Sequence, residues 1–509
     1  MTARWPDGLE AAFDAYEDAL MRDDTAVLDA LFEPGDETLR GDDAGLLRGH
    51  DAISAFRSGR GGVARRTIAA VELRPLGDDI VLVVGRSAFA GGGHGLQTQL
   101  WRRTEGVWRI AVAHVTGRPR ALDRSVWRVV GDPLVRGASD AGAGRLAGVR
   151  VAVKDLFDVA GQVVGAGNPD HERSAATATT TAPAVRALLA AGADVTGIAR
   201  TDEFAYALAG RNAHTGPTPN GADPQRIGGG STSGAASAVA LGQADLGLGT
   251  DTAGSLRVPA SYQGLWGLRT THDAVSRAGV LPLAQSFDTV GWLARTPDVL
   301  AAAAAVSLPG PVVGVDDREL LVADALLDAA APTTARAFST WLAGVGRPVR
   351  RIALPDLDLL AETLRVVQAA EAWRNHGAWI TAHPGSLGAD VAERFALAAA
   401  VTATDEHDAR TRLPGLRARI REAIDGGVLC LATAPGPAPL RTATGPDVLA
   451  TRRATLRTTA VAGVGGLPAL SVPLLQVDGA PVGVCLVGAA DTDRALVATA
   501  TALTSSPSR

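Results

Sequence analysis

Two loops rich in glycine, serine and threonine decide how this chain of 509 residues is interpreted. The first reads Gly228-Gly229-Gly230-Ser231-Thr232-Ser233-Gly234, and the second reads Gly249-Thr250-Asp251-Thr252-Ala253-Gly254-Ser255-Leu256-Arg257-Val258-Pro259. The alanine-rich segment between them predicts one short helix. Small residues let backbone N–H groups approach a ligand closely, and a plain turn is the alternative for either loop alone. The amides of Thr252, Ala253, Gly254 and Ser255 are therefore candidates for an oxyanion hole, which stabilises negative charge developing on an oxygen.

A single lysine, Lys154, stands among 48 arginines. A buried ammonium group can lose its proton near neutral pH, whereas a guanidinium group cannot. Lys154 is therefore a candidate for proton transfer, and the alternative is a structural lysine retained by chance. It ends the run 149–154, which predicts a strand.

Composition and charge restrict the function classes. Hydrophobic residues make up 46% and charged residues 20% of the chain, which is typical of a soluble globular protein. A net charge of −5 gives no cationic surface for nucleic acid or an anionic membrane. No apolar run approaches the roughly 20 residues of a membrane helix, and the first residues lack the apolar segment of a secretory signal. Cys430 and Cys485 lie in apolar stretches, which predicts buried, reduced thiols. We expect a cytoplasmic protein without nucleic-acid or membrane partners.

Several common sites are excluded by their motifs. A phosphate-binding loop needs Gly-Lys-Ser/Thr, but the single lysine follows Val153. The segment Gly247-Leu248-Gly249 lacks the third glycine of a dinucleotide fingerprint. The nine histidines form no His-Glu-x-x-His pattern or close ligand pair, and the Gly-x-Ser-x-Gly elbow of α/β-hydrolases is missing. We therefore expect neither a metal nor a cofactor.

The chain is longer than one hydrophobic core usually supports, so at least two structural units are expected. Residues 8–31 have helical spacing, and four short β-rich runs follow between residues 67 and 115. This pattern predicts a small α+β domain over 1–118. The next segment, 119–145, is rich in Gly, Arg, Pro and Asp and predicts a linker. From residue 146 to 509, strand-like runs alternate with alanine-rich helical ones, which favours an α/β layer fold.

The two loops resemble the two halves of the amidase signature, and Val153-Lys154-Asp155-Leu156-Phe157-Asp158 resembles the lysine strand of the same family. Two further segments resemble the family as well: Thr201-Asp202-Glu203-Phe204-Ala205-Tyr206 and Ser286-Phe287-Asp288-Thr289-Val290-Gly291. The resemblance implies a mixed twisted sheet flanked by helices and a Ser–cis-Ser–Lys triad. By motif position, Ser255 is the nucleophile, Ser231 is the bridging serine in a cis peptide, and Lys154 is the base. We expect these three side chains to form a hydrogen-bonded chain.

Residues near these three side chains are expected to order the loops or to bind the substrate. Asp251 is expected to order its loop by accepting backbone N–H bonds, and Arg257 to form a packing ion pair. Tyr206 and Gly230 are candidates for substrate binding, with ordinary core packing as the alternative for Tyr206. His376 and Trp379 are interpreted as a buried helical aromatic stripe or, alternatively, as a substrate wall.

The substrate is less clear than the chemistry. Three segments resemble amidases that hydrolyse indole-3-acetamide: Gly167-Asn168-Pro169-Asp170, Asn375-His376-Gly377-Ala378-Trp379-Ile380 and Thr433-Ala434-Pro435-Gly436-Pro437. Relatives with such segments include proteins that lost the triad and serve as docking or import receptors. A non-catalytic binding protein is thus the alternative to an enzyme that hydrolyses a small-molecule amide. A subunit acting on charged tRNA is disfavoured by the net charge of −5.

The N-terminal domain resembles the AtzH-like domains of the nuclear transport factor 2-like superfamily. The similar segments are Phe13-Asp14-Ala15-Tyr16, Gly49-His50-Asp51-Ala52-Ile53 and the runs 27–32 and 108–115. The resemblance implies a cone-shaped fold with an internal pocket that often pairs through its open sheet face, so a homodimer is expected. The alternative role of this domain is to shape or feed the amidase pocket. Relatives of this domain accompany amidases acting on ureido-carboxylates. The substrate therefore stays open between an aryl-acetamide and a ureido-carboxylate.

Overall fold

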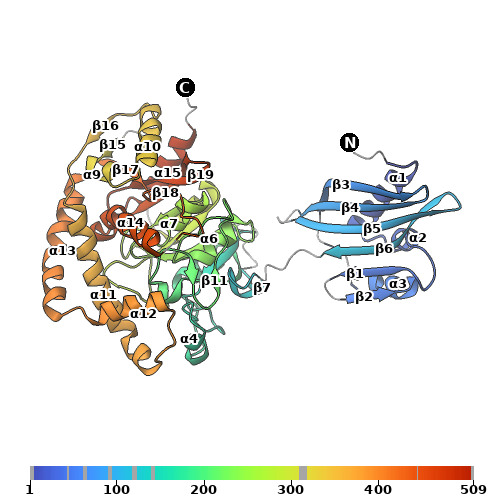
Figure 1. Cartoon of the computed structure of the whole chain (residues 1–509), viewed down its shortest axis with the longest axis horizontal. Coiled ribbons are helices and arrows are strands. Elements are labelled where there is room, and N and C mark those ends of the chain that lie inside the picture. The colour runs from blue at the N-terminus through green and yellow to red at the C-terminus, as the bar shows by residue number, and fades with distance from the viewer. Residues whose placement is uncertain are drawn as a thin grey trace. The chain divides into compact units, whose positions relative to one another are not determined.

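The computed structural model describes residues 5–505 except 43–44, 61–62, 64–65, 90–93, 117–122, 139–143, 309–317 and 444. The chain forms two compact units, Met1–Leu122 and Asp123–Arg509 (Figure 1). Each unit has its own hydrophobic core. The two are therefore described separately.

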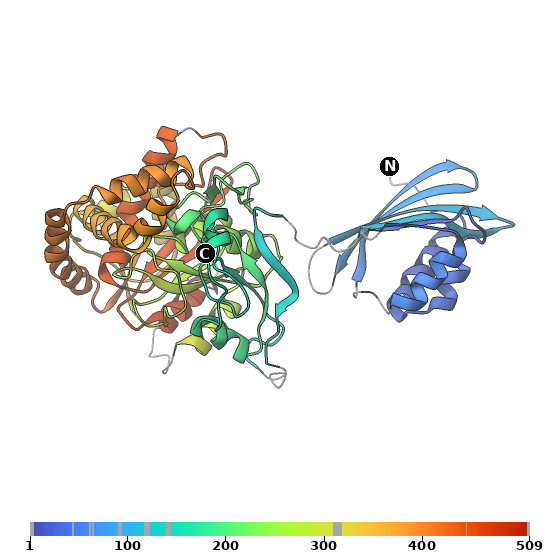
Figure 2. The same cartoon turned by 90° about the horizontal axis from the view of Figure 1, so that it is seen from below.

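The N-terminal unit is a curved sheet with helices on one face (Figure 2). Its strand order is β2-β1-β6-β5-β4-β3. The strands are β1 (Leu39–Asp42), β2 (Gly45–Arg48), β3 (Arg66–Gly77), β4 (Ile80–Phe89), β5 (His94–Thr104) and β6 (Val107–Thr116), and the helices are α1 (Leu9–Arg22), α2 (Thr25–Ala30) and α3 (His50–Arg60). Strands β3 to β6 form an antiparallel meander, whereas β1 is parallel to β6. Phe13, Tyr16, Trp101 and Ile110 lie in the core between helices and sheet. The predicted α+β character is confirmed.

The helix predicted over residues 8–31 is broken into α1 and α2. Asp23 adopts a left-handed conformation with φ 57°, which ends α1. The Asp24 carboxylate then accepts a hydrogen bond from the Val27 amide and caps α2. Aspartate tolerates both conformations, so two adjacent aspartates divide a segment whose apolar spacing is continuous.

The larger unit is built on an eleven-stranded sheet with the order β16-β15-β17-β19-β18-β13-β14-β12-β8-β9-β7 among the described residues. The strands are β7 (Trp127–Val135), β8 (Arg150–Lys154), β9 (Asp194–Ala199), β12 (Leu246–Asp251), β13 (Trp266–Arg269), β14 (Thr289–Ala294), β15 (Glu319–Val322), β16 (Val349–Arg351), β17 (Gly427–Ala432), β18 (Ala469–Val477) and β19 (Ala480–Val487). A separate ribbon pairs β10 (Arg211–Asn212) with β11 (Gly216–Pro217). The sheet is mixed: the strands from β17 to β12 are joined by antiparallel pairs, parallel pairs flank this block on both sides, and β7 is antiparallel to β9 at one edge.

Helices flank this sheet (Figure 1). They are α4 (Pro169–Ser174), α5 (Pro183–Ala190), α6 (Ser233–Ala240), α7 (Arg257–Gln263), α8 (Pro297–Ser307), α9 (Asp324–Asp328), α10 (Pro332–Gly344), α11 (Leu357–Ala382), α12 (Ala389–Ala399), α13 (Ala403–Ala423), α14 (Gly445–Gly465) and α15 (Asp493–Ser505). Helices α6, α7, α8 and α15 contact the strands directly, and α12, α13 and α14 pack against the long helix α11. The predicted mixed sheet flanked by helices is confirmed.

The sequence predicts a linker over 119–145, but the structure places a strand within this segment. Within it, β7 runs antiparallel to β9 and forms one edge of the large sheet. Trp127 is buried, and its indole N–H donates to Gln243 at 2.6 Å. An edge strand pairs on one side only, so it tolerates Gly131 and Pro133, which read as turn residues in the sequence.

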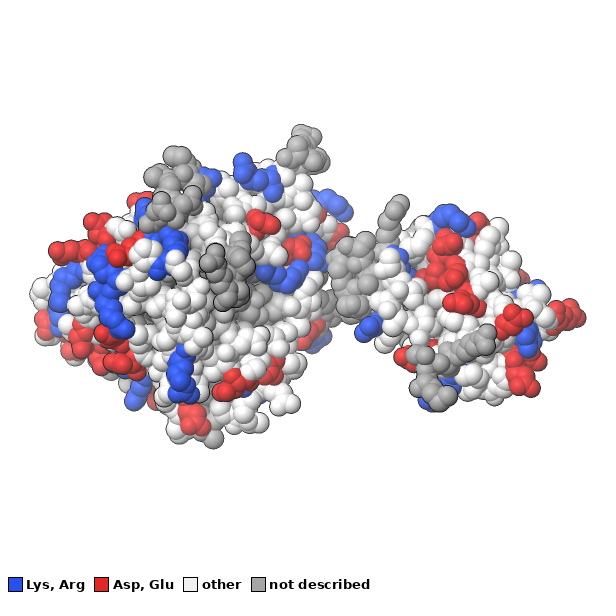
Figure 3. Space-filling view, turned by 90° about the horizontal axis from the view of Figure 1, so that it is seen from above, with Lys and Arg blue, Asp and Glu red and all other residues white. Residues whose placement is uncertain are grey.

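Charge and hydropathy of the described surface agree with an ordinary globular exterior. On the face drawn in Figure 3, basic and acidic side chains of the larger unit are interspersed. None of the described helices has the length and apolar character needed to cross a membrane. Cys430 and Cys485 are buried free thiols on the neighbouring strands β17 and β19, as predicted.

Candidate active site

The sheet brings Lys154 beside the second glycine-rich loop. Strands β8 and β12 are parallel neighbours with Val153 opposite Leu248, so their carboxyl ends lie at the same edge. Lys154 ends β8 and is completely buried. Its Nζ atom donates to three hydroxyl oxygens: Ser231 Oγ at 2.8 Å, Thr250 Oγ1 at 2.9 Å and Thr232 Oγ1 at 3.2 Å. The lysine predicted from composition therefore lies among the hydroxyl groups of both loops.

Burial changes the protonation of this lysine. Loss of solvent lowers the pKa of Lys154 from 10.5 to about 7, although the carboxylates of Asp202, Asp251 and Asp288 raise it. Its three contacts are with hydroxyl groups rather than carboxylates. A neutral amine is consequently accessible at neutral pH, which a base requires.

The first loop holds Ser231 directly before α6. The Gly230–Ser231 peptide is cis, as the resemblance implies. The Ser231 carbonyl accepts from Thr201 Oγ1 at 2.8 Å and from the Asp202 amide at 3.2 Å. A Cβ atom at Gly230 would lie 2.2 Å from the Asp202 carboxylate, so only glycine fits. The Cα of Gly230 thus faces Asp202, and a substrate contact by this residue stays a prediction.

The second loop is ordered by a buried carboxylate. Asp251 accepts the Gly254 amide at 2.8 Å and the Leu256 amide at 3.2 Å, and it pairs with Arg257 at 2.9 Å and Arg269 at 3.2 Å. Burial alone would raise the pKa of Asp251, but the two guanidinium groups outweigh it and hold that pKa well below its usual range. The interpretations of Asp251 as a loop organiser and of Arg257 as its ion-pair partner agree with these contacts.

This network corrects the composition of the candidate oxyanion hole. The Gly254 N–H already donates to Asp251, so it is not available to a ligand. The amides of Thr252, Ala253 and Ser255 donate to no other residue in the described part of the chain. Thr459 Oγ1 of α14 fixes this stretch by donating to the Ala253 carbonyl at 2.8 Å. Three of the four predicted donors therefore remain candidates.

The backbones of the Ser231 and Ser255 loops are close together, but the two serine side chains are not hydrogen-bonded to each other. The Thr232 amide donates to the Ser255 carbonyl at 3.2 Å and ties the two loops together. Within the described residues, the Ser255 hydroxyl makes no hydrogen bond to Ser231. Of the predicted Lys154–Ser231–Ser255 chain, the first link is present and the second is not made. Catalytic hydrogen bonds often tighten only when substrate binds.

Comparison with known proteins identifies the family. The Amidase family profile matches residues 135–308, and the AtzH-like profile matches residues 7–119. Amidase 1 of Arabidopsis thaliana is 36% identical over 382 residues, which cover 67% of this chain and 89% of that protein. The chain belongs to the amidase signature family. Its N-terminal unit is an AtzH-like domain.

The chain is also similar to a protein with another name and to a solved amidase structure. The translocon at the outer membrane of chloroplasts 64 of Pisum sativum is 31% identical over 393 residues, which cover 70% of this chain and 65% of that protein. A crystal structure of an amidase is 29% identical and superposes with a TM-score of 0.66, covering 75% of this chain and 92% of that one. Family and fold together make the chain an enzyme that hydrolyses carbon–nitrogen bonds other than peptide bonds.

The aromatic residues of the amidase unit pack on one another. Phe204 contacts His376 with ring centroids 5.0 Å apart and Trp379 at 5.3 Å. Tyr206 packs edge-on against Phe395 at 5.1 Å and is buried. The imidazole of His376 bonds to the Pro282 carbonyl, and burial lowers the pKa of His376 to about 4, so it is neutral. The core-packing alternative accounts for these contacts, and a substrate contact by Tyr206 stays a prediction.

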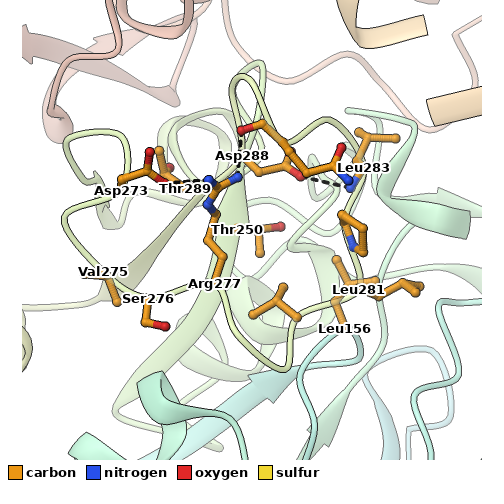
Figure 4. A pocket seen from close by; sticks show the side chains of 13 residues that line it. Leu156, Thr250, Asp273, Val275, Ser276, Arg277, Leu281, Leu283, Asp288 and Thr289 are labelled. Carbon is orange, nitrogen blue, oxygen red and sulfur yellow. Dashed lines mark hydrogen bonds and ion pairs between the residues drawn. The ribbon is translucent and has the colours of Figure 1, made fainter. Parts of the chain in front are cut away.

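A pocket of about 430 Å³ lies among the residues drawn in Figure 4, Thr250 among them. Its lining is Leu156, Thr250, Asp273, Val275, Ser276, Arg277, Val280, Leu281, Pro282, Leu283, Gln285, Asp288 and Thr289, a set without aromatic rings. Thr250 links this pocket to Lys154 Nζ, but neither Ser231 nor Ser255 lines it. Arg277 is paired with Asp273 at 2.5 Å. The described lining residues therefore form no wall of aromatic side chains.

Four residues of the site were not predicted as members. Thr232 and Thr250 bind the lysine, Asp202 faces Gly230, and Arg269 forms the second ion pair of Asp251. Both threonines stand inside the two signature loops, and Asp202 belongs to a segment that resembles the family. The sequence around Arg269 does not indicate its role, because its position beside Asp251 depends on the pairing of β13 with β14. No group of three or more His, Cys, Asp or Glu side chains within the described ranges is placed to hold a metal.

Proposed function

We propose that this amidase hydrolyses a small-molecule amide to a carboxylate and ammonia through an acyl-enzyme on Ser255, with Ser231 as bridging serine and Lys154 as base. The observation that carries the proposal is the 2.8 Å hydrogen bond between Lys154 Nζ and Ser231 Oγ in a fully buried setting. A serine hydroxyl is a weak nucleophile until a base removes its proton. A lysine whose pKa is about 7 supplies that base at neutral pH.

Acylation follows from the order of the three side chains. Neutral Lys154 accepts the Ser231 proton while Ser231 accepts the Ser255 proton, and Ser255 Oγ bonds to the amide carbon. Negative charge then forms on the carbonyl oxygen, toward which the amides of Thr252, Ala253 and Ser255 donate. The proton returns through Ser231 to the leaving nitrogen as the carbon–nitrogen bond breaks. Ammonia leaves, and the acyl group remains as an ester of Ser255.

Deacylation repeats the sequence with water. Lys154, neutral again, accepts a proton from water through Ser231, and the hydroxide oxygen bonds to the ester carbon. The ester carbon–oxygen bond breaks, and the Ser255 oxygen takes the proton back. The free acid leaves with all three side chains restored. The enzyme therefore needs no metal or cofactor for either half-reaction.

The test is a panel of primary amides with ammonia detection, followed by mass spectrometry of the enzyme during turnover. We expect an acyl adduct on the peptide that contains Ser255 and a loss of turnover of at least about 10³-fold in Ser255→Ala. Ser339→Ala, which changes an exposed serine of α10, is the matched control. An adduct on another residue, or turnover retained in Ser255→Ala, would refute the assignment of the nucleophile. A chain that hydrolyses no amide while binding one would favour the non-catalytic alternative.

Assembly and location belong to the same proposal. We infer a cytoplasmic homodimer that pairs through the AtzH-like domain. Supporting this, alternate side chains along β3 are exposed, while the helices of the domain pack against its core. Size-exclusion chromatography with light scattering measures the mass, and a monomer would refute the pairing.

A further inference from the structure

A second, narrow pocket lies behind the two catalytic loops. It has a volume of about 40 Å³ and is lined by Leu208, Ala209, Ile227, Val258, Tyr262, Arg394, Pro439, Val448, Leu449, Thr451, Arg452 and Thr455. Most of these are apolar or hydroxyl side chains. Two are arginines, and none is acidic. The pocket therefore combines apolar walls with an excess of positive charge.

The walls of this pocket continue directly into the proposed catalytic loops. Ile227 precedes the loop that carries Ser231, and the Gly230 amide donates to the Leu208 carbonyl at 2.9 Å. Val258 lies in α7, which begins two residues after Ser255. Helix α14 supplies Thr455 to the pocket and Thr459 to the Ala253 carbonyl. The pocket is therefore close to the loops that carry Ser231 and Ser255.

The two arginines differ in their partners. Arg394 donates to the Tyr206 carbonyl at 3.0 Å and pairs with Asp390 at 3.1 Å. Arg452 forms no ion pair with any described residue, and its Nε atom is buried without a hydrogen-bond partner. The Arg452 side chain is half-buried, and a buried N–H without a partner is costly, so an anionic ligand in this pocket would satisfy the Nε atom. Burial and the nearby Arg394 lower the pKa of Arg452 to about 10, which leaves it charged at neutral pH.

We infer that the substrate carries a carboxylate or an equivalent anionic group, which Arg452 binds in this pocket while the amide carbon lies at Ser255. This inference rests on the proposed amide hydrolysis and adds the substrate class. Arg452 stands seven residues before Thr459 on α14, about 10 Å along the helix axis. The anionic group is consequently separated from the amide by a spacer of several bonds.

The size of the pocket limits what accompanies the charge. A water molecule needs roughly 10–15 Å³ of such space, so 40 Å³ holds about three groups of that size. A carboxylate with one methylene fits this space, whereas an indole or phenyl ring does not. Of the two substrates left open by the sequence, the anionic one is favoured.

The experiment compares each amide acid with its neutral diamide: succinamate, glutaramate and adipamate against succinamide, glutaramide and adipamide. We expect at least one amide acid to have a KM at least about tenfold below that of its diamide, in line with a charge-assisted hydrogen bond. Arg452→Gln should raise that KM at least about tenfold and change the KM of the diamide less than about twofold. Arg452→Lys should restore part of the difference. Arg453→Gln, an exposed neighbour on the same helix, is the matched control.

Binding of glutarate, measured by isothermal titration calorimetry, separates this inference from the proposed hydrolysis. Glutarate binding that is lost in Arg452→Gln and kept in Arg453→Gln supports the anion site even if no amide is hydrolysed, and that result would refute only the hydrolysis. Amide turnover with equal KM for acids and diamides, unchanged in Arg452→Gln, would overturn the inference and leave the hydrolysis intact. A thermal unfolding scan of Arg452→Gln verifies folding, since removal of a half-buried charge without an ion-pair partner should not lower the Tm.

Discussion

The Nζ atom of Lys154 lies 2.8 Å from the Oγ atom of Ser231, although 77 residues separate the two in the sequence. Lys154 ends the interior strand β8, whereas Ser231 stands in a loop before α6. Two further hydroxyl groups, of Thr232 and Thr250, complete the surroundings of the amine. An amine held only by hydroxyl groups can donate to them or accept from them, so the site works with either protonation state.

Lys154→Arg tests whether this amine is a base. We expect kcat to fall at least about 10³-fold, as far as in Lys154→Ala, because a guanidinium group cannot accept a proton at accessible pH. The measurement is steady-state turnover together with circular dichroism to verify folding. Arg453→Lys, which exchanges the same two residue types on the surface, should have no effect. Substantial activity in Lys154→Arg would assign the lysine a structural role only.

The pH dependence of acylation should report the same group. Because the pKa of Lys154 is lowered to about 7, the neutral amine is scarce below this pH and predominates above it. The single-turnover acylation rate should therefore rise about tenfold per pH unit below pH 7 and level off above it. In Asp202→Asn the midpoint should move to lower pH, since the Asp202 carboxylate raises the pKa of Lys154. A rate that falls between pH 6 and 8 would contradict this assignment.

Thr250→Val removes one acceptor from the lysine and leaves the side-chain shape nearly unchanged. Loss of this acceptor destabilises the ammonium form of Lys154 more than its amine form. The pKa of Lys154 should therefore fall, and the midpoint of the pH profile should move to lower pH. We also expect kcat to decrease about tenfold while KM changes little, because Thr250 orients the base. Thr411→Val, on the exposed side of α13, is the control. An unchanged midpoint would show that the contact has no effect on the lysine.

Asp251→Asn should destabilise the amidase unit strongly. The carboxylate is fully buried between Arg257 and Arg269, so its loss leaves two guanidinium groups without their partner. Removing one member of a buried ion pair costs roughly 3–5 kcal/mol. Asp358→Asn breaks the exposed pair with Arg457 and should cost less than about 1 kcal/mol. Urea unfolding measures both, and equal costs would refute the structural role of Asp251.

A fragment of residues 123–509 should fold and retain the hydrolytic chemistry. It keeps the whole eleven-stranded sheet, including β7, and a core separate from that of the N-terminal unit. If the AtzH-like domain mediates dimerisation, the fragment should be a monomer with unchanged kcat. Light scattering and turnover measurements test both points. A dimeric fragment would place the dimer contact in the amidase unit instead.

Much of the candidate site could be predicted from the sequence, because it depends on residues with unusual chemistry. Lys154 is the single lysine of the chain, and Ser231 and Ser255 stand in two successive loops rich in glycine, serine and threonine. Residues that act through strand pairing gave no such signal. Thr250 meets Lys154 only because β8 and β12 are neighbours in a particular register, and Arg269 meets Asp251 only through β13 and β14.

The fold was predictable to a similar degree. Alternation of strands and helices predicts the layers, but edge strands carry weak patterns because only one side is paired. β7 lies in the segment 119–145, which was interpreted as a linker because it is rich in Gly, Arg, Pro and Asp. The break between α1 and α2 was missed because apolar spacing continues across Asp23 and Asp24. The proposed anion pocket has contributions from segments more than 200 residues apart, and no local pattern indicates it.

Because Lys154 is buried, cleavage of the chain after this residue can be used to measure unfolding. A protease specific for lysine has one peptide bond to cut, between Lys154 and Asp155, and both residues are buried. Cleavage therefore requires the end of β8 to leave its place between β12 and β9. When opening and reclosing are fast, the cleavage rate follows the population of the opened form. Two defined fragments on a gel would then measure the stability of the catalytic unit without any label, in the presence or absence of a bound amide.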